Sequence, residues 1–294
     1  MLEKKGAVMT ELERYLFDLR GYLIVRNVLS EEELQEINDV IDGVLPAWYE
    51  KAQANFIETG WGDGISQGYT NPGTGRVSLY VGRLLDWGEP IRRLVGHKRI
   101  LPYLIDLLGP SPRLDHQYAL LTRAVSASMP LHGGATPHSA YGYYNFKDQR
   151  FFCGFVVASF ALTDSPPGAG GFCCIPGSHK SNLPLPEELI NLDNPAECVA
   201  QIPVRKGDVI LFPEALTHGT LKWTADHERR AVLFKYAPRH IVWENESPFV
   251  TYDYEWEEHQ KEFFRAPRLE SYDYEWEEHQ KELLKGPHLN RANF

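Results

Sequence analysis

Two histidines and one arginine, widely separated in the sequence, have the types and settings that oxidation at a metal requires. His132 ends a short apolar stretch, His218 follows the apolar run Val209–Phe212, and Arg229 begins the next apolar run. Histidines at the ends of strands in an all-β scaffold suit a mononuclear iron with open coordination positions. A buried guanidinium suits a bidentate carboxylate such as that of 2-oxoglutarate. These three residues therefore predict an iron site with a carboxylate clamp.

The segment between the two histidines contains three motifs in order. They are Phe155–Asp164 (FVVASFALTD), Pro167–Gly171 (PGAGG) and Ile175–Lys180 (IPGSHK). Together they resemble the phytanoyl-CoA dioxygenase family of Fe(II)/2-oxoglutarate oxygenases, and the resemblance covers about residues 10 to 240. Motifs that recur in order between two candidate ligands are more specific than a single motif.

The resemblance implies a role for each candidate residue. In that family a His-X-Asp/Glu motif and a distal histidine hold the iron, so His132 and His218 are the expected metal ligands. An arginine on the strand after the distal histidine binds the far carboxylate of 2-oxoglutarate, which selects Arg229. Thr220 is expected to add a hydroxyl to the same carboxylate. The implied cofactors are Fe(II) and 2-oxoglutarate, with dioxygen as co-substrate.

Gly134 stands where the family has the carboxylate ligand. A glycine has no side chain to offer, so one further coordination position is open to an anion such as chloride or bromide, which the iron(II) charge favours. This His-X-Gly pattern resembles the Fe(II)/2-oxoglutarate halogenases, in which alanine or glycine replaces the acid. We therefore predict oxidation of an unactivated C–H bond in a small organic molecule, with halogenation favoured over hydroxylation and Gly134 as the deciding position.

Two alternatives stand beside halogenation. Glu214, four residues before His218, or His138, in the loop after His132, is a candidate replacement ligand that restores a hydroxylase. The second alternative is a jelly roll that binds a small molecule without redox chemistry. Retention of both histidines with Arg229 argues against a pure binding module, which needs no co-substrate clamp.

Strand alternation sorts the polar residues near the site. Arg229 and Arg230 are neighbours on one strand, so they face opposite sides, and Arg230 is assigned a structural role. In the strand Leu114–Arg123, His116 and Tyr118 share a side, but the sequence does not tell which side faces the interior. His179, within the PGSHK motif, is expected to make a buried hydrogen bond rather than bind metal.

The 294 residues suffice for one large domain and an extension. We expect residues 1–245 to form an all-β core with flanking helices, a double-stranded β-helix (a cupin-like jelly roll). Residues 246–294 form an acidic, aromatic extension in which Tyr252–Glu262 and Tyr272–Glu282 are identical. The extension is also a candidate contact in a homodimer.

Charge and composition limit the partners. The net charge is -10, but each repeat carries five acids and one lysine, so the rest of the chain is close to neutral. The sequence has no stripe of basic residues, so a nucleic-acid partner is not expected. No apolar run is long enough to span a membrane, and a cytoplasmic location is expected. The four cysteines are expected to be buried, reduced thiols, because the adjacent pair Cys173 and Cys174 must point to opposite faces of a strand.

Three helices are predicted from apolar spacing. The first covers Thr10–Leu19, with Leu12, Tyr15, Leu16 and Leu19 on its apolar face. The second begins after Ser30 in a capping box and runs to about Val44. The third covers Pro90–Leu108. Between the second and third, the loop residues Trp61 and Tyr69 are candidate substrate contacts.

Overall fold

The structure is a computed structural model of the 294-residue chain. It describes residues 9–53, 66–70, 77–82, 84–123, 128–137, 139, 141–238, 240–241 and 277–280. The helices are α1 (Glu11–Arg20), α2 (Glu31–Gln53), η1 (Leu84–Trp87), α3 (Glu89–Arg92), α4 (Leu101–Leu108), η2 (Ser178–Lys180) and α5 (Glu187–Ile190). The strands are β1 (Leu23–Val25), β2 (Ser66–Thr70), β3 (Val77–Gly82), β4 (Pro112–Thr122), β5 (Met129–His132), β6 (Tyr144–Lys147), β7 (Arg150–Cys153), β8 (Val156–Ala161), β9 (Gly171–Cys174), β10 (Ala200–Gln201), β11 (Val209–Pro213), β12 (His218–Leu221) and β13 (Arg229–Pro238).

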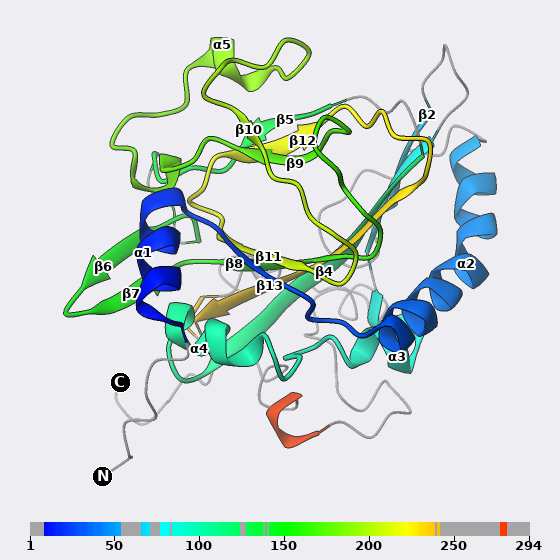
Figure 1. The fold of residues 1–294 in the computed structure, drawn as a ribbon, viewed down its shortest axis with the longest axis horizontal. Helices are drawn as coiled ribbons and strands as arrows, with labels where there is room; N and C mark the ends of the chain where they lie inside the picture. The colour runs from blue at the N-terminus through cyan, green and yellow to red at the C-terminus, as the bar shows by residue number, and fades with distance from the viewer. Residues whose placement is uncertain are drawn as a thin grey trace, which may run out of the picture.

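Two antiparallel sheets face each other. The larger has the strand order β1-β11-β8-β13-β4-β3-β2, and the smaller has the order β10-β9-β12-β5. Figure 1 shows the smaller sheet above the larger one, with the chain crossing between them several times. From β8 onward the chain passes from the larger sheet to β9 and β10, back to β11, across to β12 and back to β13, as in a jelly roll. The predicted double-stranded β-helix is confirmed.

The larger sheet is covered on both faces. All residues of β8 and β11 are buried, because one face packs on the helices and the other on the smaller sheet. In Figure 1, α3 and α4 lie on the side of this sheet away from the smaller one, and α2 runs along its edge. The inner core, between the sheets, contains Phe172, Phe212 and Leu233 among others. A strand buried on both faces reads as a continuous apolar run, which is the pattern of residues 209–212.

The predicted helices are present with changed limits or faces. Thr10 caps α1 in a capping box, and Gly21 ends it in the left-handed conformation. However, Leu12, Tyr15 and Leu19 are exposed, and Phe17 is the buried residue, so the apolar face assigned from the sequence is wrong. Residues 12, 15 and 19 have helical spacing, but Phe17 packs against the β6-β7 hairpin and turns that stripe outward.

The helix predicted over Pro90–Leu108 is two helices. It is interrupted between α3 and α4, where Gly96 has a positive φ of 60°. Pro102 then stands in the first turn of α4, a position that proline favours. By contrast, α2 begins as predicted, since the Glu33 amide donates to the Ser30 hydroxyl and the Ser30 amide donates to Glu33.

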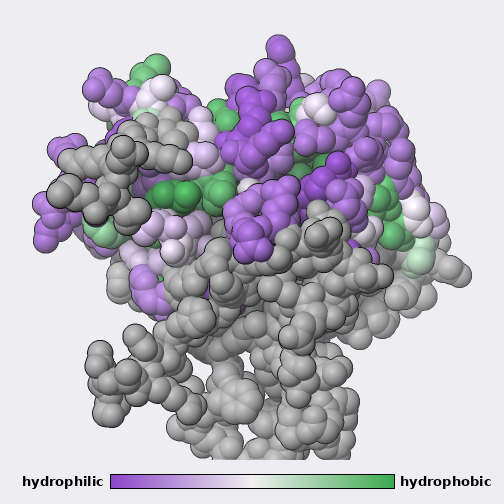
Figure 2. Space-filling model, turned by 90° about the horizontal axis from the view of Figure 1, so that it is seen from below, coloured by the Kyte–Doolittle hydropathy of each residue, from purple (hydrophilic) through white to green (hydrophobic). Residues whose placement is uncertain are grey.

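Figure 2 shows the molecule from below, the side of α3 and α4. The described residues on this face are mainly hydrophilic, and the hydrophobic ones form a few small groups. Among the described residues, no helix is both long and apolar enough to cross a lipid bilayer.

One turn of the C-terminal extension is described, at residues 277–280. The Gln280 side chain is buried and donates to the carbonyl oxygens of Arg92 and Val95, at 3.1 and 3.3 Å. The Arg92 oxygen also accepts from the Val95 amide at 3.0 Å, and both carbonyls belong to the segment that follows α3. The second repeat is therefore attached to the domain at this point, while Tyr252–Glu262 lies outside the described residues.

Candidate active site

The two histidines meet between neighbouring strands of the smaller sheet. His132 at the end of β5 pairs in register with His218 at the start of β12, and their ring centroids are 4.3 Å apart. The sequence placed them 86 positions apart, and the antiparallel pairing brings them together. His218 is buried, whereas His132 is exposed, so the pair is open on one side.

Backbone carbonyls fix the orientation of both rings. His132 Nδ1 lies 2.9 Å from the Pro130 oxygen, and His218 Nδ1 lies 2.7 Å from the Leu216 oxygen. A carbonyl only accepts, so each Nδ1 carries the proton and each Nε2 keeps a free lone pair. Burial, followed by the nearby His132, lowers the pKa of His218 to about 3, which keeps it in the neutral form that binds metals. Phe212 packs on the His218 ring at 4.7 Å and limits its rotation.

The two glycines after His132 fold tightly onto the segment before His218. Their φ angles are 75° for Gly133 and 118° for Gly134. A Cβ at Gly133 would lie 2.7 Å from the carbonyl oxygen of Glu214, so a side chain is excluded there. A Cβ at Gly134 would have room, with Thr217 Oγ1 as its nearest neighbour at 3.4 Å, but the backbone conformation disfavours any side chain. No carboxylate is present at the position that the family motif reserves for one.

Glu214 is the carboxylate that lies next to this turn. Its backbone oxygen accepts a hydrogen bond from the Gly134 amide at 3.0 Å. Its side chain forms an ion pair of 2.8 Å with Lys235, and both side chains are buried. Burial raises the pKa of Glu214, but the charge of Lys235 and the two histidines outweigh burial and bring the pKa to about 2. Among the described residues, no three His, Cys, Asp or Glu side chains converge as a metal site, so Glu214 does not join the two histidines in this conformation.

The inner face of the larger sheet supplies further polar residues. Lys235 pairs in register with His116, and Leu233 with Tyr118, so His116 and Tyr118 face the space between the sheets. The Lys235 ammonium lies 5.5 Å from the centre of the Tyr118 ring. His116 and Tyr118 are therefore on the inner side of their strand, which the sequence alone did not decide. Lys235 was not predicted as a site residue, although strand alternation from Arg229 places it on the inner face.

His116 belongs to a buried charged chain. Its Nδ1 lies 2.8 Å from Asp115, which also accepts from the Arg113 guanidinium at 2.6 Å. Burial lowers the pKa of His116, and the Asp115 hydrogen bond opposes that effect. No sequence pattern predicted this chain of residues, because it depends on the irregular pairing of β4 with β13 near Asp115.

Arg229 is buried at the start of β13 beside a small cavity between the sheets. Ser159, Ser165, Phe172 and Ile210 contribute to the cavity lining. Burial lowers the pKa of Arg229 to about 10, so it remains charged at neutral pH. Its Nη1 has no hydrogen-bond partner among the described residues. A buried guanidinium with a free donor beside a cavity is suited to bind a carboxylate.

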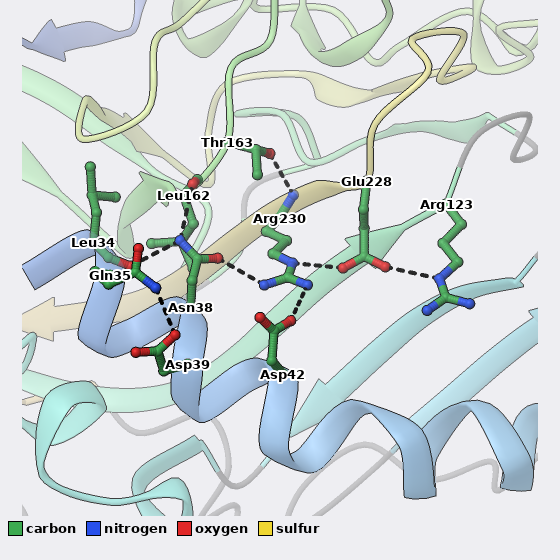
Figure 3. Close-up of polar contacts among 10 residues, drawn as sticks. All are labelled: Leu34, Gln35, Asn38, Asp39, Asp42, Arg123, Leu162, Thr163, Glu228 and Arg230. Carbon is green, nitrogen blue, oxygen red and sulfur yellow. Dashed lines mark hydrogen bonds and ion pairs between the residues drawn. The ribbon is translucent and has the colours of Figure 1, made fainter. Parts of the chain in front are cut away.

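The neighbouring Arg230 points the other way, towards α2 (Figure 3). Its guanidinium bonds Glu228 at 2.7 Å, Asp42 at 2.6 Å and Asn38 at 2.9 Å. Arg230 therefore has the structural role that was predicted for it. Strand alternation correctly separated it from Arg229.

The remaining predicted residues are distributed as follows. Thr220 is buried on β12, two residues beyond His218 on the same face, and pairs with Phe172. His179 is buried, and its Nε2 lies 3.1 Å from the Asp18 oxygen, so it bonds backbone as expected. His138 and Trp61 lie outside the described residues, as does the side chain of Tyr69. Three cysteines are buried, but Cys198 is exposed, contrary to expectation.

The profile of the phytanoyl-CoA dioxygenase (PhyH) family matches residues 17–231 of the chain. The chain belongs to this family. Its members are non-haem enzymes that use iron and 2-oxoglutarate, so the chain is an iron- and 2-oxoglutarate-dependent enzyme, as the motifs predicted. No curated protein sequence matches the chain.

Solved structures share the fold. HygX from Streptomyces hygroscopicus, with nickel, 2-oxoglutarate and hygromycin B bound, is 24% identical over 80% of this chain and 89% of its own, with a TM-score of 0.63. The 2-oxoglutarate-dependent epimerase SnoN from nogalamycin biosynthesis is 20% identical over 83% of this chain and 91% of its own, with a TM-score of 0.57. AviO1 from Streptomyces viridochromogenes Tue57 is 18% identical over 79% of this chain and 96% of its own, with a TM-score of 0.57.

The described residues fit the family's cofactors. His132 and His218 each bond a backbone carbonyl through Nδ1, so their Nε2 atoms are left for a metal, and the buried Arg229 has a free donor for a carboxylate. Along β9, Cys174 pairs with His218, and Gly171 lies against Arg229, where a Cβ would be 3.2 Å from the guanidinium Nε. Three residues of strand, roughly 10 Å, therefore connect the histidine pair with the arginine.

Proposed function

We propose that this enzyme oxidises an unactivated C–H bond of a small organic molecule, with halogenation favoured over hydroxylation. His132 and His218 bind the iron through their Nε2 atoms. Arg229 binds the far carboxylate of 2-oxoglutarate, with Thr220 contributing a hydroxyl. Iron(II) with 2-oxoglutarate and dioxygen supplies the oxidant, and the protein's task is to orient these groups and the substrate.

The observation that carries the choice is that, among the described residues, no carboxylate joins the two histidines. Gly134 has no side chain, and the nearest acid, Glu214, is in an ion pair with Lys235. A dication held by two neutral ligands retains its full charge, so it favours an anion from solution. A chloride held beside Gly134 by iron on His132 and His218 would supply the halogen for the substrate carbon.

A hydroxylase with a recruited ligand is the second candidate. Glu214 is bonded through its backbone to Gly134, and its pKa responds to both histidines, so its carboxylate lies within electrostatic reach of the metal position. If Glu214 leaves Lys235 for the iron, the ordinary set of two histidines and one carboxylate is restored.

The substrate class follows from the neighbours only in outline. HygX is described with hygromycin B bound, and SnoN with nogalamycin RO. The proposal that this enzyme also acts on a small natural product agrees with these examples. The identity of the molecule is outside the proposal.

The test is the charge-transfer absorption of the anaerobic complex with Fe(II) and 2-oxoglutarate, titrated with chloride. We expect the band to shift with chloride in the natural protein and in Glu214→Gln. Gly134→Asp should lose the chloride response, whereas Gly134→Ala, which carries the same backbone strain without a carboxylate, should keep it. A band that ignores chloride in the natural protein but responds in Glu214→Gln would identify the hydroxylase.

A further inference from the structure

Glu214 lies beside the turn that contains Gly134 and carries a carboxylate that is paired with Lys235. Its backbone oxygen receives the Gly134 amide at 3.0 Å, directly beside the missing ligand. The carboxylate is buried between the sheets, where an uncompensated charge is strongly unfavourable. It therefore needs a cation, and the site offers two: the iron and the Lys235 ammonium.

Lys235 is equally dependent on Glu214. It stands on the inner face of β13 with a side chain 12% exposed, and its Nζ lies 2.8 Å from Glu214 Oε1. Its other polar neighbours, Tyr118 and His116, carry no negative charge of their own. Asp115, on β4, is bonded by Arg113 and His116. Among the described residues, Glu214 is the carboxylate in contact with Lys235.

The two charges come from segments that the fold holds rigidly. Lys235 lies within a ten-residue strand that is paired on both sides, with β4 and with β8. Glu214 immediately follows β11, and its amide donates to the Phe155 oxygen at 3.0 Å. Because both backbones are held, only rotation of the two side chains can separate the pair.

We infer that Lys235 is a positioning residue that holds the Glu214 carboxylate off the iron, and so keeps the coordination position beside Gly134 open to an external anion. The inference rests on the proposed function and goes beyond it, because it names the residue that decides between the halide-binding and carboxylate-bound sites. Replacing the lysine by an uncharged residue should free Glu214, for which the iron then becomes the available cation.

The experiment compares Lys235→Met with the double variant Lys235→Met/Glu214→Gln, each titrated anaerobically with Fe(II), 2-oxoglutarate and chloride. We expect Lys235→Met to form the charge-transfer band but to lose its chloride response. The double variant should regain that response, since no carboxylate is left to bind. The control is Lys206→Met, which removes an exposed lysine paired with Glu31 at 2.6 Å and should behave as the natural protein.

A second readout does not depend on the band. Without metal, Lys235→Met contains a buried carboxylate with no partner, so its thermal midpoint should fall. Fe(II) should then raise that midpoint by more than it raises the midpoint of the natural protein, and should bind at least tenfold more tightly. In the double variant this additional shift should disappear. If Lys235→Met does not fold, Lys235→Gln retains a hydrogen-bond donor to Glu214 and should show a partial loss of the chloride response.

The outcomes separate the two claims. If the natural protein responds to chloride and Lys235→Met responds equally, with no additional metal stabilisation, the role of Lys235 is wrong while the open site stands. If the natural protein itself ignores chloride, the proposed open site fails, and the role of Lys235 fails with it.

Discussion

Arg229 and Arg230 are adjacent residues with opposite surroundings. Arg229 faces a cavity between the sheets with a free donor, whereas Arg230 is bonded to three side chains on the helical side. Strand alternation causes the difference, since consecutive side chains point to opposite faces. One arginine is thus available to a ligand, and the other stabilises the contact between β13 and α2 (Figure 3).

Substitution of the two arginines should separate binding from stability. Arg229→Met should raise the dissociation constant of 2-oxoglutarate by about 100-fold, or ~3 kcal/mol, because a bidentate charged contact is lost. Arg230→Met should leave that constant unchanged but lower the free energy of unfolding by about 2 kcal/mol, because Glu228 loses a partly buried partner. Isothermal titration calorimetry and urea denaturation measure the two effects. An equal loss of 2-oxoglutarate binding in both variants would contradict the assignment.

The sequence predicted individual residues where a local rule applied. Alternation separated Arg229 from Arg230, and the spacing of motifs selected His132 and His218. The same alternation places Lys235 inside, but a lysine near the end of a strand is usually solvated, so the rule alone did not single it out. Its pairing with Glu214 depends on the strand order β11-β8-β13 in the larger sheet, which no local pattern specifies.

At the scale of elements, His179 joins the short helix η2 to α1. Its ring is buried against Tyr144 at 4.5 Å and bonds the Asp18 oxygen. Gly21 must be a glycine here, since a Cβ would lie 2.5 Å from His179 Nδ1. The histidine of the PGSHK motif therefore anchors the N-terminal helix to the barrel.

This contact predicts a dependence of stability on pH. Burial lowers the pKa of His179 from 6.5 to about 4, so the unfolded chain binds a proton more readily than the folded one. Stability is retained above pH 6.5 and decreases as the pH falls towards 4, by up to roughly 3 kcal/mol. Chemical denaturation at pH 7, 6 and 5 should show this slope, and His179→Gln should reduce it. An unchanged slope in His179→Gln would assign the dependence to other groups.

The sequence predicted where the helices begin, but it did not predict which face of α1 is buried. The capping residues Thr10 and Ser30 fixed where α1 and α2 begin, because these hydrogen bonds are local. The buried face of α1 is set by the distant β6-β7 hairpin, which receives Phe17. The apolar stripe of Leu12, Tyr15 and Leu19 has the correct helical period but does not identify its partner.

At the scale of the whole molecule, the two cores differ in the side chains that they contain. The core between the larger sheet and the helices is apolar, while the core between the sheets accommodates His218, Glu214, Lys235 and Arg229. The family motifs predicted this jelly roll, and the sheets confirm it. The division into a domain of residues 1–245 and an extension stays a prediction, as does a homodimer formed through the extension.

The extension offers an internally controlled test. Gln280 is 3% exposed and satisfies two backbone carbonyls, so Gln280→Ala should lower the free energy of unfolding by about 1–2 kcal/mol. Gln260→Ala makes the same change in the identical first repeat and should have no comparable effect. Thermal denaturation of both variants measures the difference. Equal destabilisation by the two changes would contradict the assignment of the effect to the contact with Arg92 and Val95.

The most direct measurement is a crystal structure grown without oxygen in the presence of Fe(II), 2-oxoglutarate and bromide, with anomalous data collected at the bromine absorption edge. The account predicts iron bound by His132 and His218, 2-oxoglutarate extending to Arg229, and a bromide peak on the iron beside Gly134. Glu214 should remain paired with Lys235. Iron bound by the Glu214 carboxylate, with no bromide peak beside it, would contradict the open site and establish the carboxylate-bound alternative.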